Sequence, residues 1–289
     1  MSVVLGQALR ASFSGSPAGG LPEPSPCRPG EGSLYYDRFK HGRRRAAVQG
    51  NQAGKDRRRL PKTIAIDGPG ASGKSDVGNL VARRLGYLFF DTGAMYRALT
   101  WLALRRGLDP EDEEAVGRLA AETVMEVSPP PPGSRDPQGS EHCRVRVDGE
   151  DATPHLTAPE VEASVSLVSR VPAVRREMVR MQRRLAQRGP TVMAGRDIGT
   201  TVLPDADLKV YLDASREERA RRRWQQLALG GAAPSFESVL ADLEKRDAID
   251  SSRSVSPLRP AADAVIIKTD GLSLEEVVER VLSLVEARA

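Results

Sequence analysis

A glycine-rich loop between an apolar run and a helical pattern constrains the fold of this chain more than any other feature. The loop, Gly68–Ser75, fits G-x-x-x-x-G-K-[ST] and follows the β-branched run Thr63–Ile66. Apolar residues then recur at helical spacing as far as Leu85, and Gly86 ends the pattern. Small residues allow successive backbone N–H groups to surround a polyphosphate, and the helix N-terminus adds partial positive charge. The sequence therefore predicts a nucleotide-phosphate site.

Each residue of this loop has an expected part in binding. We expect Lys74 to reach the β and γ phosphates and Ser75 to supply an oxygen to Mg²⁺. The residues expected to bind the nucleotide are Gly68, Pro69, Gly70, Ala71, Ser72, Gly73, Lys74, Ser75 and Asp76. The alternative is a glycine-rich turn with a chance lysine, which the flanking strand and helix disfavour. The loop by itself does not separate kinases from GTPases, ATPases or switches.

Strand and helix patterns alternate along the rest of the chain. Strands are expected at 87–90, 191–194, 208–213 and 264–268, and helices at 95–106, from Asp109, at 159–170, 172–188, 215–229, 235–245 and from Ser273. Strands separated by helices predict a parallel sheet covered on both faces, with ligands at the carboxyl ends of the strands. The expected fold class is α/β, a P-loop NTPase-type sheet flanked by helices.

Two regions depart from this alternation. Residues 125–155 contain a proline run, alternating valines and the turn signal Asp148-Gly149, and they predict a small antiparallel insertion. Residues 1–60 hold 11 Lys+Arg against 4 Asp+Glu among Gly, Pro and Ser, and they predict a disordered basic extension before a domain at 61–289. A transit peptide or an upstream start codon would give the same composition.

Composition excludes several other classes of protein. No apolar stretch approaches the roughly 20 residues needed to cross a bilayer, so no membrane partner is expected. Cys27 and Cys143 have no metal-ligand spacing, which favours a reduced, cytoplasmic protein. The arginine runs of the extension lack interleaved aromatics, so nucleic acid is not an expected partner.

Three segments resemble the signature segments of bacterial cytidylate kinases. They are Ile66–Ser75, Phe90–Arg97 and Gly195–Thr200, and further similarity lies in 205–220 and 246–258. The resemblance covers residues 62–287. It implies ATP-dependent phosphorylation of CMP and dCMP, Mg²⁺ as cofactor, a monomer, a CMP-binding role for the insertion, and a mobile lid at about 215–235.

The resemblance also implies a set of site residues. Those expected to bind substrate are Thr92, Arg97, Ser166, Arg175, Arg196, Asp197, Arg246, Asp250 and Arg253, and those expected to assist catalysis are Lys74, Arg196, Arg246 and Arg253. Guanidinium groups bind phosphate oxygens bidentately and neutralise charge during transfer. The Arg196-Asp197 pair follows a strand, where open α/β sheets bind ligands. The alternative for each arginine, taken singly, is a solvated surface residue with no part in binding. The same alternative applies to the charged helix that carries Arg216, Arg219, Arg221, Arg222 and Arg223.

Two residues depart from the pattern of that family. Asp76 follows Ser75 where Thr is usual, and Ala194 precedes Gly195 where Asp is usual. Both positions are expected in the active site. A carboxylate at position 76 predicts weaker ATP binding, because it places negative charge near a phosphate. Loss of a carboxylate at position 194 predicts slower turnover.

Two other functions remain open at this point. Another small P-loop kinase, acting on UMP, AMP, shikimate or dephospho-coenzyme A, would carry the same loop, and a nucleotide panel separates these. A nucleotide-sensing or nucleic-acid-binding module would depend on the basic extension, and salt-dependent binding lost on deleting residues 1–60 would reveal it.

Overall fold

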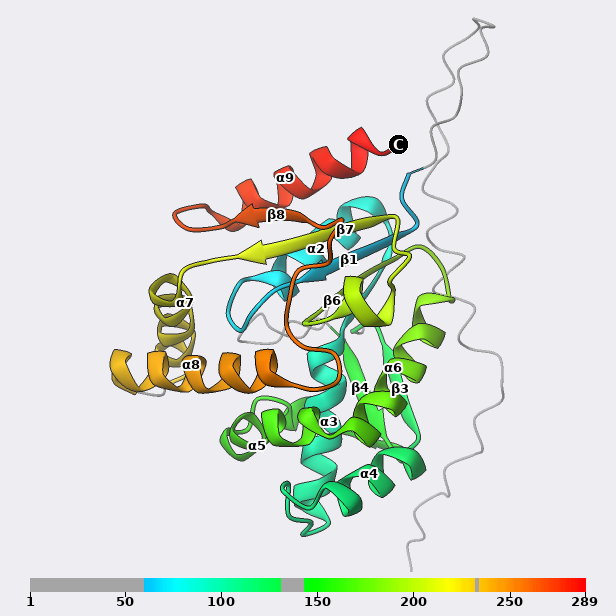
Figure 1. The fold of residues 1–289 in the computed structure, drawn as a ribbon, viewed down its shortest axis with the longest axis vertical. Helices are drawn as coiled ribbons and strands as arrows, with labels where there is room; N and C mark the ends of the chain where they lie inside the picture. The colour runs from blue at the N-terminus through cyan, green and yellow to red at the C-terminus, as the bar shows by residue number, and fades with distance from the viewer. Residues whose placement is uncertain (1–59, 131–142, 232–233) are drawn as a thin grey trace, which may run out of the picture. The chain divides into compact units, whose positions relative to one another are not determined.

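The computed structural model describes residues 60–130, 143–231 and 234–289, so the predicted basic extension lies outside the described residues. The described chain forms a main sheet, a smaller second sheet and the helices around them (Figure 1). The strands are β1 (Thr63–Asp67), β2 (Leu88–Asp91), β3 (Met125–Ser128), β4 (Arg144–Val147), β5 (Glu150–Asp151), β6 (Thr191–Gly195), β7 (Leu208–Asp213) and β8 (Val265–Lys268). The helices are α2 (Lys74–Leu85), α3 (Thr92–Arg105), α4 (Glu113–Glu122), α5 (Pro159–Arg170), α6 (Pro172–Ala186), α7 (Arg216–Leu229), α8 (Phe236–Ser252) and α9 (Leu274–Ala287). None of the helices described is long and apolar enough to cross a membrane.

The main sheet is parallel and has the order β2-β6-β1-β7-β8. In its centre Ile64 lies between Val192 of β6 and Leu208 of β7. These residues are fully buried, as expected for strands of a parallel sheet that is covered on both faces. The predicted α/β class is confirmed.

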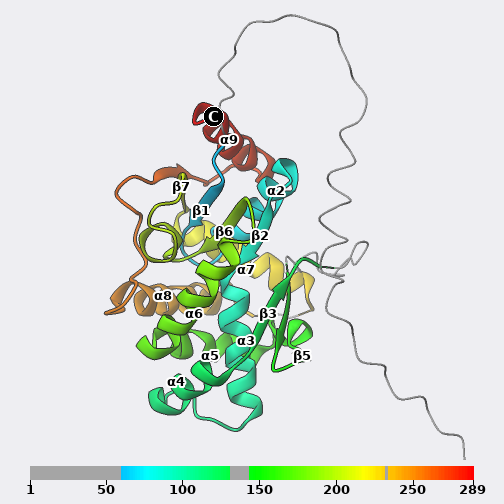
Figure 2. The same cartoon turned by 90° about the vertical axis from the view of Figure 1, so that its right-hand side faces the viewer.

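Helices cover both faces of the sheet, and two apolar clusters fill the space between (Figure 2). Ile64 and Ile66 pack with residues of α2 and α9 on one face, whereas Ala65 packs with α3 and α6 on the other. This alternation follows from the two-residue period of side chains along a strand. The segments that carry the site follow the carboxyl ends of β1, β2 and β6.

The predicted antiparallel insertion is present as the sheet β3-β4-β5. Val127 and Val145 are paired across β3 and β4, and both are buried against the α3 side of the core. Asp148 and Gly149 both have positive φ, 50° and 84°, in the turn between β4 and β5. The turn signal in the sequence therefore marked the hairpin correctly.

Several helix boundaries differ from the sequence-based expectation. Helix α3, expected from Met95, begins at Thr92, because the Asp91 side chain caps it. The helix expected from Asp109 begins at Glu113, because the Asp112 side chain accepts a hydrogen bond from the Ala115 N–H and caps it, while Asp109 closes a preceding turn. The helix expected to end near residue 245 continues to Ser252. Its extra two turns hold Arg246 and Asp250 on rigid backbone.

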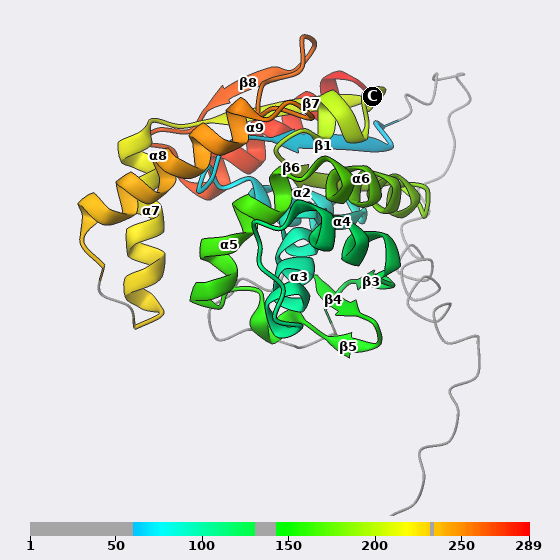
Figure 3. The same ribbon diagram turned by 60° about the horizontal axis from the view of Figure 1, so that its bottom comes forward.

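Helices α7 and α8 lie side by side next to the carboxyl end of the main sheet (Figure 3). Ala220, Val239 and Leu243 form a small buried cluster between them. The Ser215 side chain caps α7 and the Ser235 side chain caps α8. The region predicted as a lid, about 215–235, thus contains α7 and ends at the start of α8, against which α7 packs.

Candidate active site

The glycine-rich loop joins β1 to α2 and requires glycine at two positions. Gly68 has φ 157°, and a Cβ there would lie 2.5 Å from the carbonyl oxygen of Leu212. Gly73 has φ 86° and immediately precedes α2. Because these glycines let the chain turn tightly, the N-terminus of α2 faces the site.

Lys74 is folded back over this loop. Its Nζ donates to the carbonyl oxygen of Pro69 at 3.0 Å. Burial lowers the pKa of Lys74 well below its ordinary value, and the nearby Arg196 guanidinium lowers it further. Negative charge placed beside the ammonium group would act in the opposite direction and raise the pKa of Lys74.

Asp250 links two arginines opposite the loop. It accepts from Arg196 Nε at 2.7 Å and from Arg253 Nη2, which also donates to Ser169 Oγ at 2.7 Å. Burial alone would raise the pKa of Asp250, but the two arginines outweigh it and lower the pKa. The carboxylate is therefore held ionised and fixes both guanidinium groups.

A second buried ion pair lies beside this cluster. Arg175 Nη2 donates to Asp197 Oδ2 at 2.5 Å, and the Arg175 guanidinium lies 5.4 Å from the centre of the Tyr96 ring. Burial raises the pKa of Tyr96 to about 12, so the phenol stays protonated. Together with Ser166, this pair gives the wall of the cavity both donors and acceptors.

Asp67 supports the Arg196-Asp197 loop from β1. Its carboxylate accepts from the backbone N–H groups of Ile198, at 2.6 Å, and Gly199, at 2.7 Å. Burial raises the pKa of Asp67 to about 6, although these hydrogen bonds act in the opposite direction. Sequence reasoning missed this role, because its hydrogen-bond partners lie about 130 residues away.

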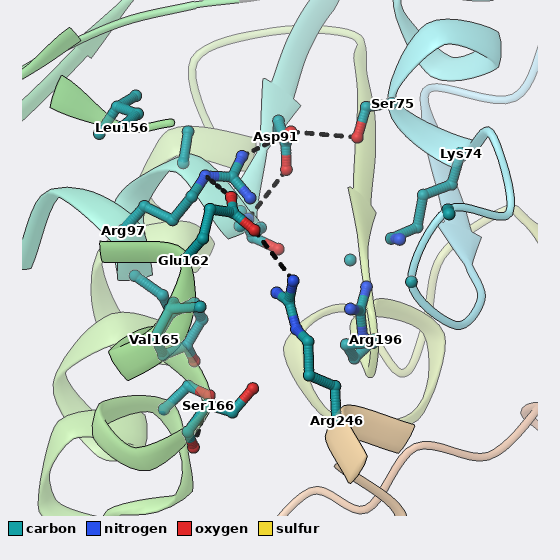
Figure 4. Close-up of a pocket in the computed structure, with 18 of the residues that line it drawn as sticks. Lys74, Ser75, Asp91, Arg97, Leu156, Glu162, Val165, Ser166, Arg196 and Arg246 are labelled. Carbon is teal, nitrogen blue, oxygen red and sulfur yellow. Dashed lines mark hydrogen bonds and ion pairs between the residues drawn. The ribbon is translucent and has the colours of Figure 1, made fainter. Parts of the chain in front are cut away.

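Glu162 is a further site residue that sequence reasoning missed (Figure 4). Its Oε2 accepts from Arg246 Nη1 at 2.9 Å and lies 3.4 Å from Arg223 Nη2. Arg97 Nε lies 3.9 Å from Oε1. The available signal was its position four residues before Ser166, which puts both on one face of α5.

Asp91 connects the acceptor side to the glycine-rich loop. Its Oδ2 accepts from Ser75 Oγ at 3.0 Å and lies 3.5 Å from Arg97 Nη2 (Figure 4). Its Oδ1 accepts from the Gly93 N–H. The strand expected to end at Phe90 continues through Asp91, which caps α3. Arg97, on the second turn of α3, lines the cavity.

One cavity of about 530 Å³ collects most of the predicted site residues. Those that line it are Gly70, Ala71, Gly73, Lys74, Ser75, Asp76, Thr92, Arg97, Ser166, Arg175, Arg196, Asp197, Arg246, Asp250 and Arg253. Gly68, Pro69 and Ser72 belong to the loop but do not line the cavity. Ala194 does not line it either, because its side chain is fully buried in the apolar cluster on the α2 side of the sheet.

The arginines of α7 divide into two groups. Arg219 is buried and donates to the carbonyl oxygen of Gly70 at 3.2 Å, Arg222 approaches that of Ser72 at 3.4 Å, and Arg223 lines the cavity. Arg216 and Arg221 are exposed and pair with glutamates. A solvated surface therefore describes only the second group.

A phosphate loop facing an arginine cluster across one cavity, on a parallel sheet, defines a P-loop kinase. The family described as Cytidylate kinase matches residues 64–287, and the chain belongs to this family.

Curated relatives match the same part of the chain. A cytidylate kinase of Chloroflexus aggregans is 51% identical over 78% of this chain and 94% of its own length. A cytidylate kinase of Desulfitobacterium hafniense is 48% identical over 76% of this chain and 91% of its own length. Among solved structures, shikimate kinase from Acinetobacter baumannii in complex with shikimate shows 18% identity and a TM-score of 0.38 over 80% of this chain and 95% of its own. Such a TM-score supports no inference, and the fold is defined by the chain's own topology.

Proposed function

We propose that this protein transfers the terminal phosphoryl group of ATP to CMP and dCMP. One observation carries the proposal: a single cavity holds the glycine-rich loop with Lys74 and, opposite it, the arginines fixed by Asp250. Two phosphate groups bound at these places would face each other. The family and its curated relatives support cytidine monophosphate as the acceptor.

The reaction proposed is a direct in-line transfer. An oxygen of the CMP phosphate forms a bond to the γ-phosphorus as the bond to the β-γ bridging oxygen breaks, and that oxygen leaves with ADP. Lys74, Arg196, Arg246 and Arg253 supply positive charge around the phosphoryl group, which spreads negative charge over its oxygens in the transition state. No covalent intermediate is required, since alignment and charge neutralisation account for the chemistry.

Specificity for cytosine is proposed to come from the polar wall. Asp197 and Ser166 would accept from the amino group of cytosine, and Arg175 would donate to its ring acceptors. Uracil presents an oxygen where cytosine presents its amine, so two acceptors would meet and UMP would bind poorly. Asp250 is proposed to accept from the ribose hydroxyls, with lone pairs left after it binds the two arginines.

The residues beside the loop suit Mg²⁺. Ser75 Oγ and the Asp91 carboxylate lie within hydrogen-bond distance, and both offer oxygens, which Mg²⁺ prefers. Within the described residues no group of three or more His, Cys, Asp or Glu is arranged to hold a metal, which fits an ion bound mainly through nucleotide phosphates. When bound, Mg²⁺ neutralises phosphate charge. Ser75 and Asp91 would help to hold the ion through their oxygens.

A coupled ADP-release assay with ATP, Mg²⁺ and each of CMP, dCMP, UMP and AMP tests the proposal. Fast turnover with CMP and dCMP alone is expected. Equal or faster turnover with UMP or AMP would overturn the assignment of the acceptor.

We also propose that the enzyme is a cytoplasmic monomer, and light scattering after size exclusion at working concentration tests its oligomeric state.

A further inference from the structure

Glu162 lies at the centre of an arginine cluster, where a phosphate group would be expected. Its carboxylate is within 4 Å of three guanidinium groups, those of Arg97, Arg223 and Arg246. Figure 4 shows Arg97 and Arg246 on either side of it. All four side chains line the cavity. The three arginines come from α3, α7 and α8, whereas Glu162 comes from α5, so one carboxylate joins four helices.

The charges favour an anion at this place. Three guanidinium groups face a single carboxylate, and a carboxylate offers arginine the same kind of oxygen acceptors as a phosphate does. Burial alone would raise the pKa of Glu162, but Arg97, Arg246 and Arg223 outweigh it and lower the pKa. The side chain is therefore a permanent anion near neutral pH.

Glu162 differs from Asp197 and Asp250, the two most deeply buried carboxylates that hold arginines in this site. The side chains of Asp197 and Asp250 are 6% and 4% exposed, and each is fixed beneath its arginines. The Glu162 side chain is 18% exposed and is longer. It contacts Arg223 and Arg246 through their terminal nitrogens, which are the atoms that bind phosphate oxygens. It can therefore withdraw from these arginines more readily than the two aspartates can.

We propose that Glu162 is an internal substitute for phosphate, a positioning residue that holds Arg97, Arg223 and Arg246 together in the empty site and releases them when phosphate groups arrive. The proposal rests on the proposed function only in that the arriving anions are nucleotide phosphates. The competition itself requires only an anion.

Two consequences follow from competition. Each phosphate that binds must break ion pairs to Glu162, so the carboxylate weakens binding. The same carboxylate can take the arginines back after transfer, which assists product release. Removal of its charge should therefore tighten anion binding while turnover does not rise. Damage to the fold would not produce tighter binding.

Glu162→Gln and the matched control Glu160→Gln test this proposal. Glu160 is an exposed residue in the same first turn of α5, so both variants lose one charge from one helix turn. Isothermal titration would measure the Kd of CMP, cytidine and inorganic pyrophosphate. We expect Glu162→Gln to lower the Kd of CMP and pyrophosphate about fivefold, as for loss of one partly exposed ion pair, with cytidine unchanged. Glu160→Gln should match the wild type.

Steady-state kinetics provide the second readout. For Glu162→Gln the KM for CMP should fall and kcat should fall or stay constant. If Kd for both anions rises or stays unchanged in a folded Glu162→Gln protein, the proposal is wrong. If that variant does not fold, Glu162→Asp is measured instead, because the shorter side chain keeps the charge but moves it away from the arginines. Tighter pyrophosphate binding in Glu162→Asp would support the proposal. Weaker or equal binding would reject it.

Failure of the proposed function would look different. A wild-type protein that turns over no CMP, together with tighter pyrophosphate binding in Glu162→Gln, would reject the function and keep the substitute role. Normal CMP turnover by the wild type, together with unchanged pyrophosphate binding in Glu162→Gln, would keep the proposed function and reject the substitute role of Glu162.

Discussion

Asp67 controls the site through backbone groups rather than through substrate. It is 3% exposed, and its two oxygens hold the N–H groups of Ile198 and Gly199, directly after the Arg196-Asp197 pair. Its folded-state pKa of about 6 lies above the ordinary value of 3.8. The folded state therefore binds this proton more tightly than the unfolded state does.

The sign of the pH dependence follows from this difference. The contribution of Asp67 to the free energy of unfolding is fully present below about pH 3.8 and is lost as pH rises through about 6. In Asp67→Asn that proton no longer titrates, so the stability difference between wild type and variant should shrink as pH rises from 4 to 6.5. Urea denaturation of both proteins at several pH values measures it. A constant difference across this window would contradict the assignment.

The same substitution should also lower activity. An amide places an N–H₂ group toward one of the two backbone N–H donors, so one hydrogen bond is lost and the Arg196 loop loosens. We expect kcat/KM to fall roughly tenfold or more, since loss of a buried hydrogen bond costs on the order of 1–3 kcal/mol. An unchanged kcat/KM at pH 7.5 would show that this loop needs no support from β1.

Asp76 places a carboxylate at the N-terminus of α2, inside the cavity. It lies in the first turn of α2 and lines the cavity beside Lys74 and Ser75. Asp76→Thr should lower the KM for ATP several-fold, because it removes a negative charge close to the phosphates, and Asp76→Asn should act alike. The KM for CMP serves as the internal control. A raised KM for ATP in both variants would mean that the carboxylate assists binding.

Among the elements, helix α7 is tied to the glycine-rich loop by Arg219. This guanidinium, 5% exposed, pairs with Asp247 of α8 at 2.7 Å and donates to the carbonyl oxygens of Gly70 and Ala214. Arg219 therefore fixes the first turn of α7 to α8 and to the glycine-rich loop, whereas Trp224 and Leu229, further along the helix, are exposed.

Arg219→Met should lower the free energy of unfolding more than loss of an exposed arginine of α7 does. It leaves the Asp247 carboxylate and two carbonyl oxygens without their donor, and we expect a loss of about 2–3 kcal/mol in the free energy of unfolding. Arg221→Met, which removes an exposed arginine of the same helix, should cost at most about 0.5 kcal/mol. Urea denaturation of the two variants makes the comparison. Equal effects would show that Arg219 is no anchor.

Elements with local signals were the ones that sequence predicted well. Helix α5 begins at Pro159 and strand β7 spans 208–213 as expected, because a proline in a first turn and the alternation of Leu208, Val210 and Leu212 are local features. The start of α4 was missed because Asp109 and Asp112 are both good capping residues, and only the fold selects between them. Glu162 and Asp67 were missed because their partners are distant in sequence, whereas the arginines were found through family resemblance.

In the whole molecule, the first described residues tie the start of β1 to other parts of the fold. Pro61 accepts from Tyr87 Oη, and the N–H groups of Lys62 and Thr63 donate to Asp207. A chain that begins at Leu60 keeps these contacts, whereas one that begins at Ile64 loses them.

We therefore expect a chain that begins at Leu60 to phosphorylate CMP with the kcat/KM of the full chain. The coupled assay on both chains measures this, with a chain that begins at Ile64 as a destabilised comparison. A large loss of activity on removal of residues 1–59 would give the basic extension a part in catalysis. Nucleic-acid affinity that is lost with it would instead favour a binding role.

The position of β1 at the centre of the sheet has a consequence for how the protein acquires its structure. Both neighbours of this first strand, β6 and β7, come from residues 191–213, more than 120 residues later. During synthesis β1 and the glycine-rich loop must wait, without sheet partners, until most of the chain has left the ribosome. Contacts this distant in sequence slow folding. Until β6 and β7 are available, β1 is an unpaired apolar strand, and we expect chaperones to bind it.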